Sequence, residues 1–317
     1  MSLSSMQLSL VQFQLKLKQP LIILPIILLS QLMINSAFAD ITDDAFTCNK
    51  LLSKGDYSQA LVLSEQIIKQ DSKSREGLQC KGRALGALGK IDDGIVAIKA
   101  ADKLAAKPFD HLVALTLLGN LQKSVKNYSE AIATYQQSLS IAQAENNTLF
   151  QRINNNLLGE TLIDNNQIQA GLDSYLAGSK FVANDNERAD SYQRLATTYS
   201  LLKQHDLAIQ NQIRALLMQT QSGTLDEYAN TSLELGRIYT AAGEYANADR
   251  ALAKLIKFSQ ENGGAYYEAK GLYYSGLAKA ASGDNTAAKA FYADASKIAK
   301  QVGDAELIKN IDDANQQ

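Results

Sequence analysis

The residues of this chain that could take part in catalysis or metal binding are few and scattered. The two histidines, His111 and His205, lie far apart in the sequence, and neither has a cysteine or a second histidine at the short spacing of zinc sites. Three Asp-Asp pairs occur, but neighbouring residues of a helix point about 100° apart, so the two carboxylates of a pair do not converge on one substrate atom. Neither a Gly-x-Ser-x-Gly elbow nor a Gly-x-x-x-x-Gly-Lys phosphate loop is present. We therefore expect no catalytic residue, no metal site and no cofactor, and we predict that the chain is not an enzyme.

The overall charge argues against a polyanionic partner. The chain has a net charge of −2, and removal of residues 1–39, which carry two lysines and no acid, makes it more negative. Nucleic-acid binding requires a concentrated basic surface. No basic run after residue 39 is longer than two residues, so we expect no binding to nucleic acid.

Residues 1–39 have the layout of a signal peptide. Lys16 and Lys18 precede an apolar run at 21–34, and the segment ends in Ala-Phe-Ala. The apolar run is shorter than the roughly 20 residues that a membrane-spanning helix needs. We predict cleavage after Ala39, although the sequence leaves open whether the segment is instead retained as an anchor.

The remainder of the chain repeats one pattern at intervals of 34 to 40 residues. In each unit a small residue is followed twelve positions later by a second small residue. The first members are Cys48, Gly82, Gly119, Gly159, Ala196, Gly236 and Gly276, and the second are Ala60, Gly94, Ala131, Gly171, Ala208, Ala248 and Ala288. Two antiparallel helices approach closely only where both present small side chains. Each unit is therefore predicted to be a helical hairpin.

The turns between the small residues support this interpretation. They read KGDY, VKNY, AGEY and SGDN in four of the units, with Gly available for a left-handed helix end and Asp or Asn for the next helix start. The unit at 235–252 is the clearest, with Leu-Gly-x-x-Tyr followed by Ala-x-x-x-Leu. This pattern resembles the tetratricopeptide repeat, whose simplest period is 34 residues. The chain departs from the family pattern in lacking tryptophan and in its longer periods.

The resemblance implies an all-α fold. We expect a right-handed α-solenoid of about seven helix-turn-helix repeats over residues 40–300. A C-terminal capping helix is predicted at 301–317, where Leu307, Ile308 and Ile311 can cover the apolar face of the last repeat.

The resemblance also implies a concave groove lined by the first helix of each repeat, which commonly holds an extended peptide or a partner helix. Its inward-facing positions correspond here to Asn49, Gln79, Arg83, Thr116, Asn120, Asn156, Glu160, Gln193, Thr197, Leu233, Arg237 and Tyr273. Side-chain amides can bond both groups of a peptide backbone, which favours an extended partner; they are equally ordinary on a solvated helix surface. The lysine cluster with which a subset of the family clamps C-terminal carboxylates is absent, so that specificity is not expected.

Cys48 and Cys80 fall in the first helices of neighbouring repeats. In an exported chain a disulfide between them would staple the N-terminal end of the solenoid. The alternative is that both are small buried residues at helix contacts. Facing helix axes lie about 8–10 Å apart, whereas a disulfide needs Cα atoms within about 7 Å, so the sequence leaves the pairing open.

Together these features predict a non-catalytic scaffold that resembles exported bacterial members of the family and binds a protein or peptide in the groove. The periplasm is favoured over the extracellular space, and no stable membrane insertion is expected once the signal peptide is cleaved. The alternative is a sensory or regulatory module that docks onto a membrane receptor or enzyme. The sequence does not indicate the partner, the pathway or the oligomeric state.

Overall fold

The computed structural model describes residues 44–316, and the predicted signal peptide lies outside this range. The described chain is helical throughout and contains no strand. Residues 44–54 form the first described helix. The helices that follow are α2 (Tyr57–Gln70), α3 (Arg75–Ala87), α4 (Ile91–Lys103), α5 (Pro108–Ser124), α6 (Tyr128–Ala144), α7 (Thr148–Asp164), α8 (Ile168–Gly178) with the short 3-10 helix η1 (Ser179–Phe181), α9 (Asp185–Leu201), α10 (His205–Ser222), α11 (Leu225–Ala241), α12 (Tyr245–Glu261), α13 (Ala265–Ala281), α14 (Asn285–Val302) and α15 (Ala305–Asn315).

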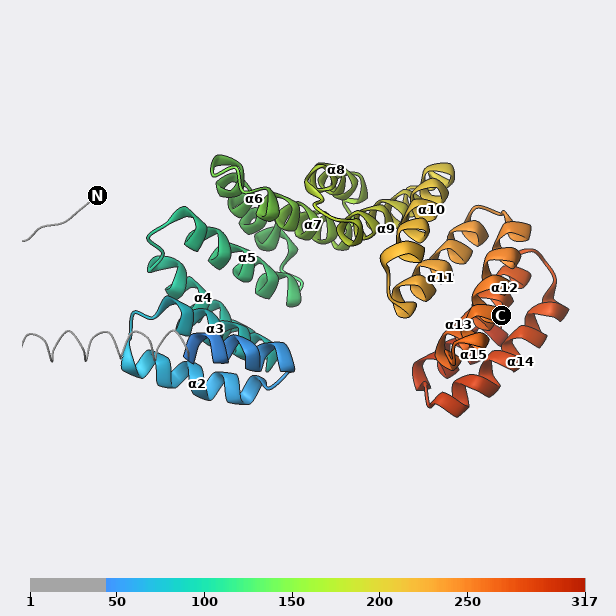
Figure 1. The fold of residues 1–317 in the computed structure, drawn as a ribbon, viewed down its shortest axis with the longest axis horizontal. Coiled ribbons are helices and arrows are strands. Elements are labelled where there is room, and N and C mark those ends of the chain that lie inside the picture. Colours follow the sequence, from blue (N-terminus) through green and yellow to red (C-terminus); the bar gives the residue numbers. More distant parts are fainter. Residues whose placement is uncertain (1–43, 317) are drawn as a thin grey trace, which may run out of the picture.

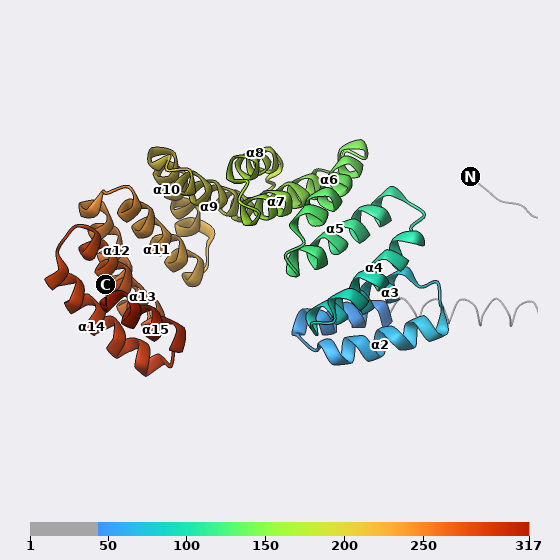
Figure 2. The ribbon, with the colours of Figure 1, turned by 180° about the vertical axis from the view of Figure 1, so that it is seen from behind.

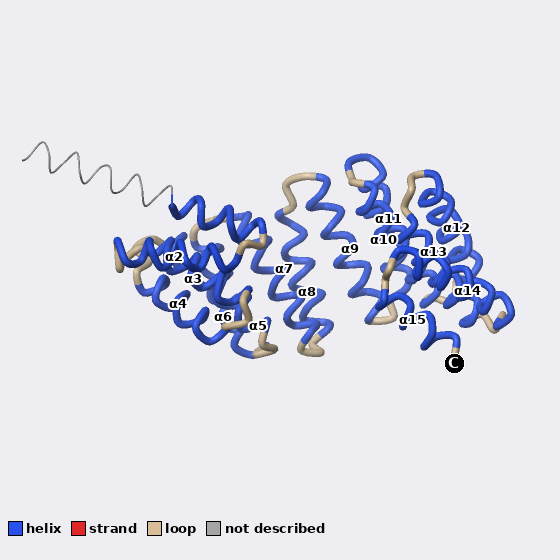
Figure 3. Tube along the Cα trace, turned by 90° about the horizontal axis from the view of Figure 1, so that it is seen from below, coloured by secondary structure: helices blue, strands red, loops and turns tan. Residues whose placement is uncertain are grey.

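The helices form pairs that follow one another along an arch (Figure 1). The first and last repeats form the two arms of the arch, and the same arrangement is seen from behind in Figure 2. At the centre, α7 and α9 lie on the inner side while α8 and α10 lie on the outer side. Figure 3 shows the pairs side by side along the long axis. The predicted all-α repeat solenoid is confirmed.

Contact between small residues explains the pairing of helices within a repeat. A Cβ atom added to Gly236 in α11 would lie 2.5 Å from Cδ2 of Leu252 in α12, and one added to Gly119 in α5 would lie 2.5 Å from Cε1 of Tyr135 in α6. Real Cβ atoms essentially never come so close, so a larger residue at either position would displace the large side chain of the second helix. Leu252 and Tyr135 are fully buried in these contacts.

The turn inside each helix pair has the same geometry in all seven pairs of residues 44–302. Seven positions after the first small residue, the backbone takes a left-handed conformation, as at Gly243 with φ 75°. Glycine suits this conformation because it has no Cβ. In three repeats the residue is instead Lys126, Asn166 or Lys203, with φ between 59° and 61°. The turn geometry is therefore imposed by the helix pair and does not depend on glycine.

The C-terminal helix α15 covers the end of the last repeat. Leu307 and Ile311 are buried against Tyr292 and the alanines of α14, and Ile308 packs beside them. The apolar face of α14 is in this way removed from water.

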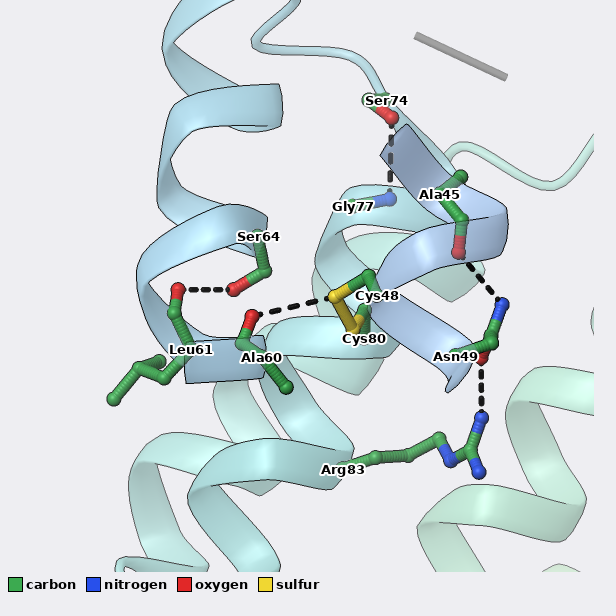
Figure 4. Close-up of a disulfide and its surroundings, with 10 residues drawn as sticks. All are labelled: Ala45, Cys48, Asn49, Ala60, Leu61, Ser64, Ser74, Gly77, Cys80 and Arg83. Carbon is green, nitrogen blue, oxygen red and sulfur yellow. Dashed lines mark hydrogen bonds between the residues drawn. A yellow bond between two sulfur atoms is a disulfide. The ribbon is translucent and has the colours of Figure 1, made fainter. Parts of the chain in front are cut away.

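At the N-terminal end, Cys48 and Cys80 form a disulfide with a Cα separation of 6.3 Å (Figure 4). The bond joins the helix at 44–54 to α3, and both cysteines are buried. Cys48 therefore both occupies the small-residue position of the first repeat and ties that repeat to its neighbour.

The double variant Cys48→Ala/Cys80→Ala tests the contribution of this disulfide. A bond that closes a loop of this length, with a sequence separation of 32 residues, contributes about 3–4 kcal/mol in the chain-entropy treatment. Because each repeat contacts only its neighbours, we expect faster amide hydrogen exchange in residues 44–70 and unchanged exchange in α13 to α15. Equal acceleration along the whole chain, or none in residues 44–70, would contradict this assignment.

Candidate functional site

The inner side of the arch presents a wall formed by the first helices of the repeats (Figure 1). Most of the side chains expected to face the groove are at least partly open to solvent. Asn49, Arg83 and Asn120 are exposed, and Gln79, Asn156, Glu160, Gln193, Thr197, Arg237 and Tyr273 are partly exposed. We call these ten residues the inner wall.

Two residues expected in the groove are buried, and their assignment as partner-binding residues is corrected. Thr116 is 8% exposed and Leu233 is 6% exposed. The hydroxyl of Thr116 donates to the carbonyl of Leu112 at 2.8 Å and lies 3.2 Å from Oδ1 of Asn154 in α7. Leu233 belongs to an apolar cluster with Leu252 of α12. Both side chains therefore point into the contact with the second helix and the next repeat.

Several inner-wall side chains bond residues on the first helix of a neighbouring repeat. Arg83 donates to Oδ1 of Asn49 at 2.6 Å (Figure 4), and Thr197 donates to Oε1 of Glu234 at 3.3 Å. Gln193 bonds the hydroxyl of Thr231 in the same way. The wall is thus partly ordered before any partner arrives, which reduces the entropy lost on binding.

The centre of the wall contains a cavity of about 310 Å³ between α7 and α9. Inner-wall residues Glu160, Gln193 and Thr197 line it, together with Arg194 and Tyr175. The guanidinium carbon of Arg194 lies 5.6 Å from the centroid of the Tyr175 ring. This cavity combines an aromatic surface with charged and amide groups, which is a suitable receptor for a single partner side chain.

Charges around this cavity compensate one another. Glu160 pairs with Lys123, and Arg194 donates to Asp190 at 2.8 Å while approaching Glu160 at 3.9 Å. Burial alone lowers the pKa of Arg194, but the hydrogen bond and charge of Asp190 raise it above its ordinary value. Burial raises the pKa of Tyr175, and Arg194 opposes that change. Arg194 is therefore fixed as a cation at the centre of the wall.

Sequence reasoning missed Arg194 and Asp190. Both lie at positions of α9 other than the two per repeat that the family pattern assigns to the groove. The signal available was their i, i+4 spacing with opposite charge, which predicts an ion pair on one helix face but does not place that face toward the hollow.

Outside the central cavity, three inner-wall side chains contact residues of their own repeat. Asn120 accepts a hydrogen bond from the hydroxyl of Tyr135 at 2.6 Å, and burial, together with the charge of Glu160, raises the pKa of that tyrosine. Arg237 makes two hydrogen bonds to Glu234, at 2.8 and 2.6 Å. Tyr273 packs against the ring of Tyr292, with centroids 6.2 Å apart.

The described residues include no group of three or more His, Cys, Asp or Glu side chains placed to hold a metal ion. His111 lies 2.9 Å from Asp102 in a partly exposed pair, and His205 begins α10. Across residues 44–316, none of the helices is both long and apolar enough to cross a membrane. The arrangement offers hydrogen bonding, ion pairing and aromatic contact.

Two stretches of the chain, residues 114–149 and 189–221, match family models of the tetratricopeptide repeat. A search of curated protein sequences gives no match. Among solved structures, the apo form of RapI is similar over 87% of this chain and 96% of its own, at 14% identity and a TM-score of 0.61.

Two further structures show the same similarity. BtubC (BKLC) from P. vanneervenii aligns over 68% of this chain and 92% of its own, at 15% identity and a TM-score of 0.57. The C-terminal part of a TPR repeat-containing protein from Cytophaga hutchinsonii aligns over 84% of this chain and 98% of its own, at 13% identity and a TM-score of 0.57. At such identities the likeness concerns the fold.

The correction of Thr116 can be tested with a matched pair of substitutions. Thr116→Val removes a buried hydroxyl, and Oδ1 of Asn154 loses the hydrogen bond from it. We therefore expect the free energy of unfolding to fall by about 1–3 kcal/mol. Thr197→Val removes a partly solvated hydroxyl and should cost less than about 1 kcal/mol. Urea denaturation of both variants provides the measurement, and an equal cost would show that Thr116 is not the more buried of the two.

Proposed function

Because the chain is a tetratricopeptide-repeat protein, as its repeat pattern predicted, we propose that it is a non-catalytic scaffold that binds a protein partner along the inner wall. Repeats of this family typically mediate protein-protein interaction. The observation that carries the proposal is the inner wall itself, a continuous surface of amides, hydroxyls and two arginines. Such groups can pair with the N–H and C=O groups of an extended peptide.

Arg83 is the inner-wall residue best placed to contact a partner. It is exposed, its bond to Asn49 is to a neutral amide, and no ion pair involving it occurs within residues 44–316. Burial of part of its side chain lowers the pKa of Arg83, with no acid to offset the effect. A carbonyl or carboxylate of a partner would supply the compensation that Arg194 and Arg237 already receive from acids of this chain.

The central cavity supports the same function. Its lining residues come from two neighbouring repeats. A partner side chain inserted there would therefore also fix the position of the peptide along the wall. The partial ordering of the wall by its own hydrogen bonds favours this mode, because few side chains need to be immobilised on binding.

Substitution of the two wall arginines tests the groove. In pull-down experiments from cell-envelope extract, we expect Arg83→Gln/Arg237→Gln to lose partners that the native protein retains, because both donors face the partner. The control is Lys99→Gln/Lys254→Gln, which removes the same charge from exposed positions on α4 and α12, the second helices of the same two repeats. Equal recovery of every partner by both variants would refute partner binding at the inner wall.

We further propose that the protein acts in the cell envelope, with the periplasm favoured. The basis is the signal-peptide layout of residues 1–39, and the Cys48–Cys80 disulfide is consistent with an oxidising compartment. N-terminal sequencing of the protein recovered from the envelope fraction should give a chain that starts at Asp40. A product that begins before Ala39, or recovery only from the cytosol, would contradict this localisation.

A further inference from the structure

The pairing of charges around the central cavity is incomplete. Glu160, Asp164 and Asp190 line the cavity, and of the described residues that line it Arg194 alone is basic. Lys123 lies outside the lining and pairs with Glu160 and, at 3.4 Å, with Oδ2 of Asp164. Three carboxylates therefore share two cations, and one negative charge is left in excess.

The carboxylates of this cluster are more accessible than its cations. The side chains of Glu160, Asp164 and Asp190 are 45%, 42% and 44% exposed. Those of Arg194 and Lys123 are 31% and 18% exposed. Lys123 approaches Asp164 through Oδ2, which leaves Oδ1 for a second cation. The surface that the cluster presents to solvent is therefore mainly carboxylate.

The helix ends at this cavity add to its negative potential. α7 ends at Asp164 and α9 ends at Leu201, and both residues line the cavity. The C-terminal end of a helix is the negative pole of its dipole, so it favours a nearby cation and disfavours an acid. Neither α7 nor α9 has a basic residue in its last turn, whereas α5 has Lys123 there. Asp164 thus stands where its own helix disfavours an acid and where an external cation would be stabilised.

An apolar surface lies beside the carboxylates. Ile163, Leu201 and Tyr175 line the same cavity, and Leu201 is 47% exposed. Lysine and arginine side chains bury their methylene stems against apolar surface while the charged head stays with polar groups. Arg194 already adopts this arrangement, with its guanidinium carbon 5.6 Å from the Tyr175 ring centroid and a hydrogen bond to Asp190. The cavity offers the same surroundings to a second side chain of this kind.

The surrounding first helices have the same sign of charge. Together α7, α9 and α11 carry eight acidic residues and four arginines, a net charge of −4. The second helices of the same repeats, α8, α10 and α12, carry four acidic and four basic residues, a net charge of zero. A negative wall attracts cationic segments and repels acidic ones. The charge difference therefore directs a basic segment to the inner side of the arch.

From these charges, helix ends and apolar groups we infer that the partner inserts a lysine or arginine side chain into the central cavity. Its charged head lies between Glu160 and Asp164, and its methylene stem lies against Ile163 and Leu201. An acidic side chain is disfavoured, because Arg194 is already paired and an incoming carboxylate would face three others. The inference rests on the proposed function, since it names the chemistry of the partner segment that the inner wall binds.

Peptide selection tests the inference without knowledge of the partner. A library of random peptides displayed on phage would be selected against the native protein and counter-screened against Arg83→Gln/Arg237→Gln. We expect the peptides that require the wall arginines to share a lysine or arginine at one common position. Wall-dependent peptides without a common basic residue would overturn the inference and leave the proposed function standing. If the native protein selects no wall-dependent peptide, both are overturned.

A neutral analogue measures what the positive charge contributes. One selected peptide would be synthesised with its common basic residue replaced by norleucine for lysine or citrulline for arginine, and titrated into the protein by isothermal calorimetry. We expect the analogue to bind about tenfold more weakly or worse, since a hydrogen bond between charged groups is lost. The difference should shrink at high salt because the carboxylates are partly exposed. Equal affinity of the peptide and its analogue at low salt contradicts the inference.

A matched pair of double variants locates the contact. Glu160→Gln/Asp164→Asn should bind the basic peptide about tenfold more weakly and the neutral analogue as tightly as the native protein does. The control Asp173→Asn/Asp206→Asn removes two charges from exposed positions on α8 and α10, the second helices of the same two repeats. Melting temperatures of both variants verify that the fold is retained. Equal weakening by the two variants would mean that the peptide is attracted only by the overall charge, and the cavity assignment would fail.

Discussion

The close contact of two helices in each repeat is the constraint on which the rest of this structure depends. Backbones approach until a glycine or alanine of one helix meets a small residue of the other, and a Cβ added to Gly159 would lie 3.0 Å from the carbonyl oxygen of Gly171. A large side chain four positions further on then fills the space beside the contact. In the fifth repeat that place is taken by Gln212, which is fully buried and donates to the carbonyl of Thr231 at 2.8 Å. The side chain at this position therefore fills the helix contact in most repeats, whereas in the fifth repeat it also forms a hydrogen bond to the next repeat.

Stacking of these hairpins determines which side chains remain for recognition. Side chains of successive first helices come within hydrogen-bonding distance, so Arg83 bonds Asn49 and Thr197 bonds Glu234. Part of the inner wall therefore links neighbouring repeats through the same groups that we propose bind a partner. Each of these hydrogen bonds contributes only about 0.5–1.5 kcal/mol to stability. Their larger effect is to hold the wall in one arrangement, so that Arg194 remains beside Tyr175 in the central cavity.

The two ends of the solenoid are closed by different means. The disulfide between Cys48 and Cys80 crosslinks the first described repeat to the second, whereas α15 covers the last repeat with Leu307 and Ile311.

The sequence by itself determined the fold, because the small residues that permit helix contact recur at spacings that are visible along the chain. The pattern best seen around Gly236 also indicated the family, and ten of the twelve side chains that it predicted to face the groove are at least partly open to solvent. It could not distinguish Thr116 and Leu233, which are buried, from Gln193, which occupies the equivalent position and is partly exposed. Nor could it decide whether Cys48 and Cys80 are bridged, since their Cα separation of 6.3 Å is set by how two repeats stack. Burial and distance between repeats depend on the superhelical packing of whole helices, which only the tertiary structure specifies.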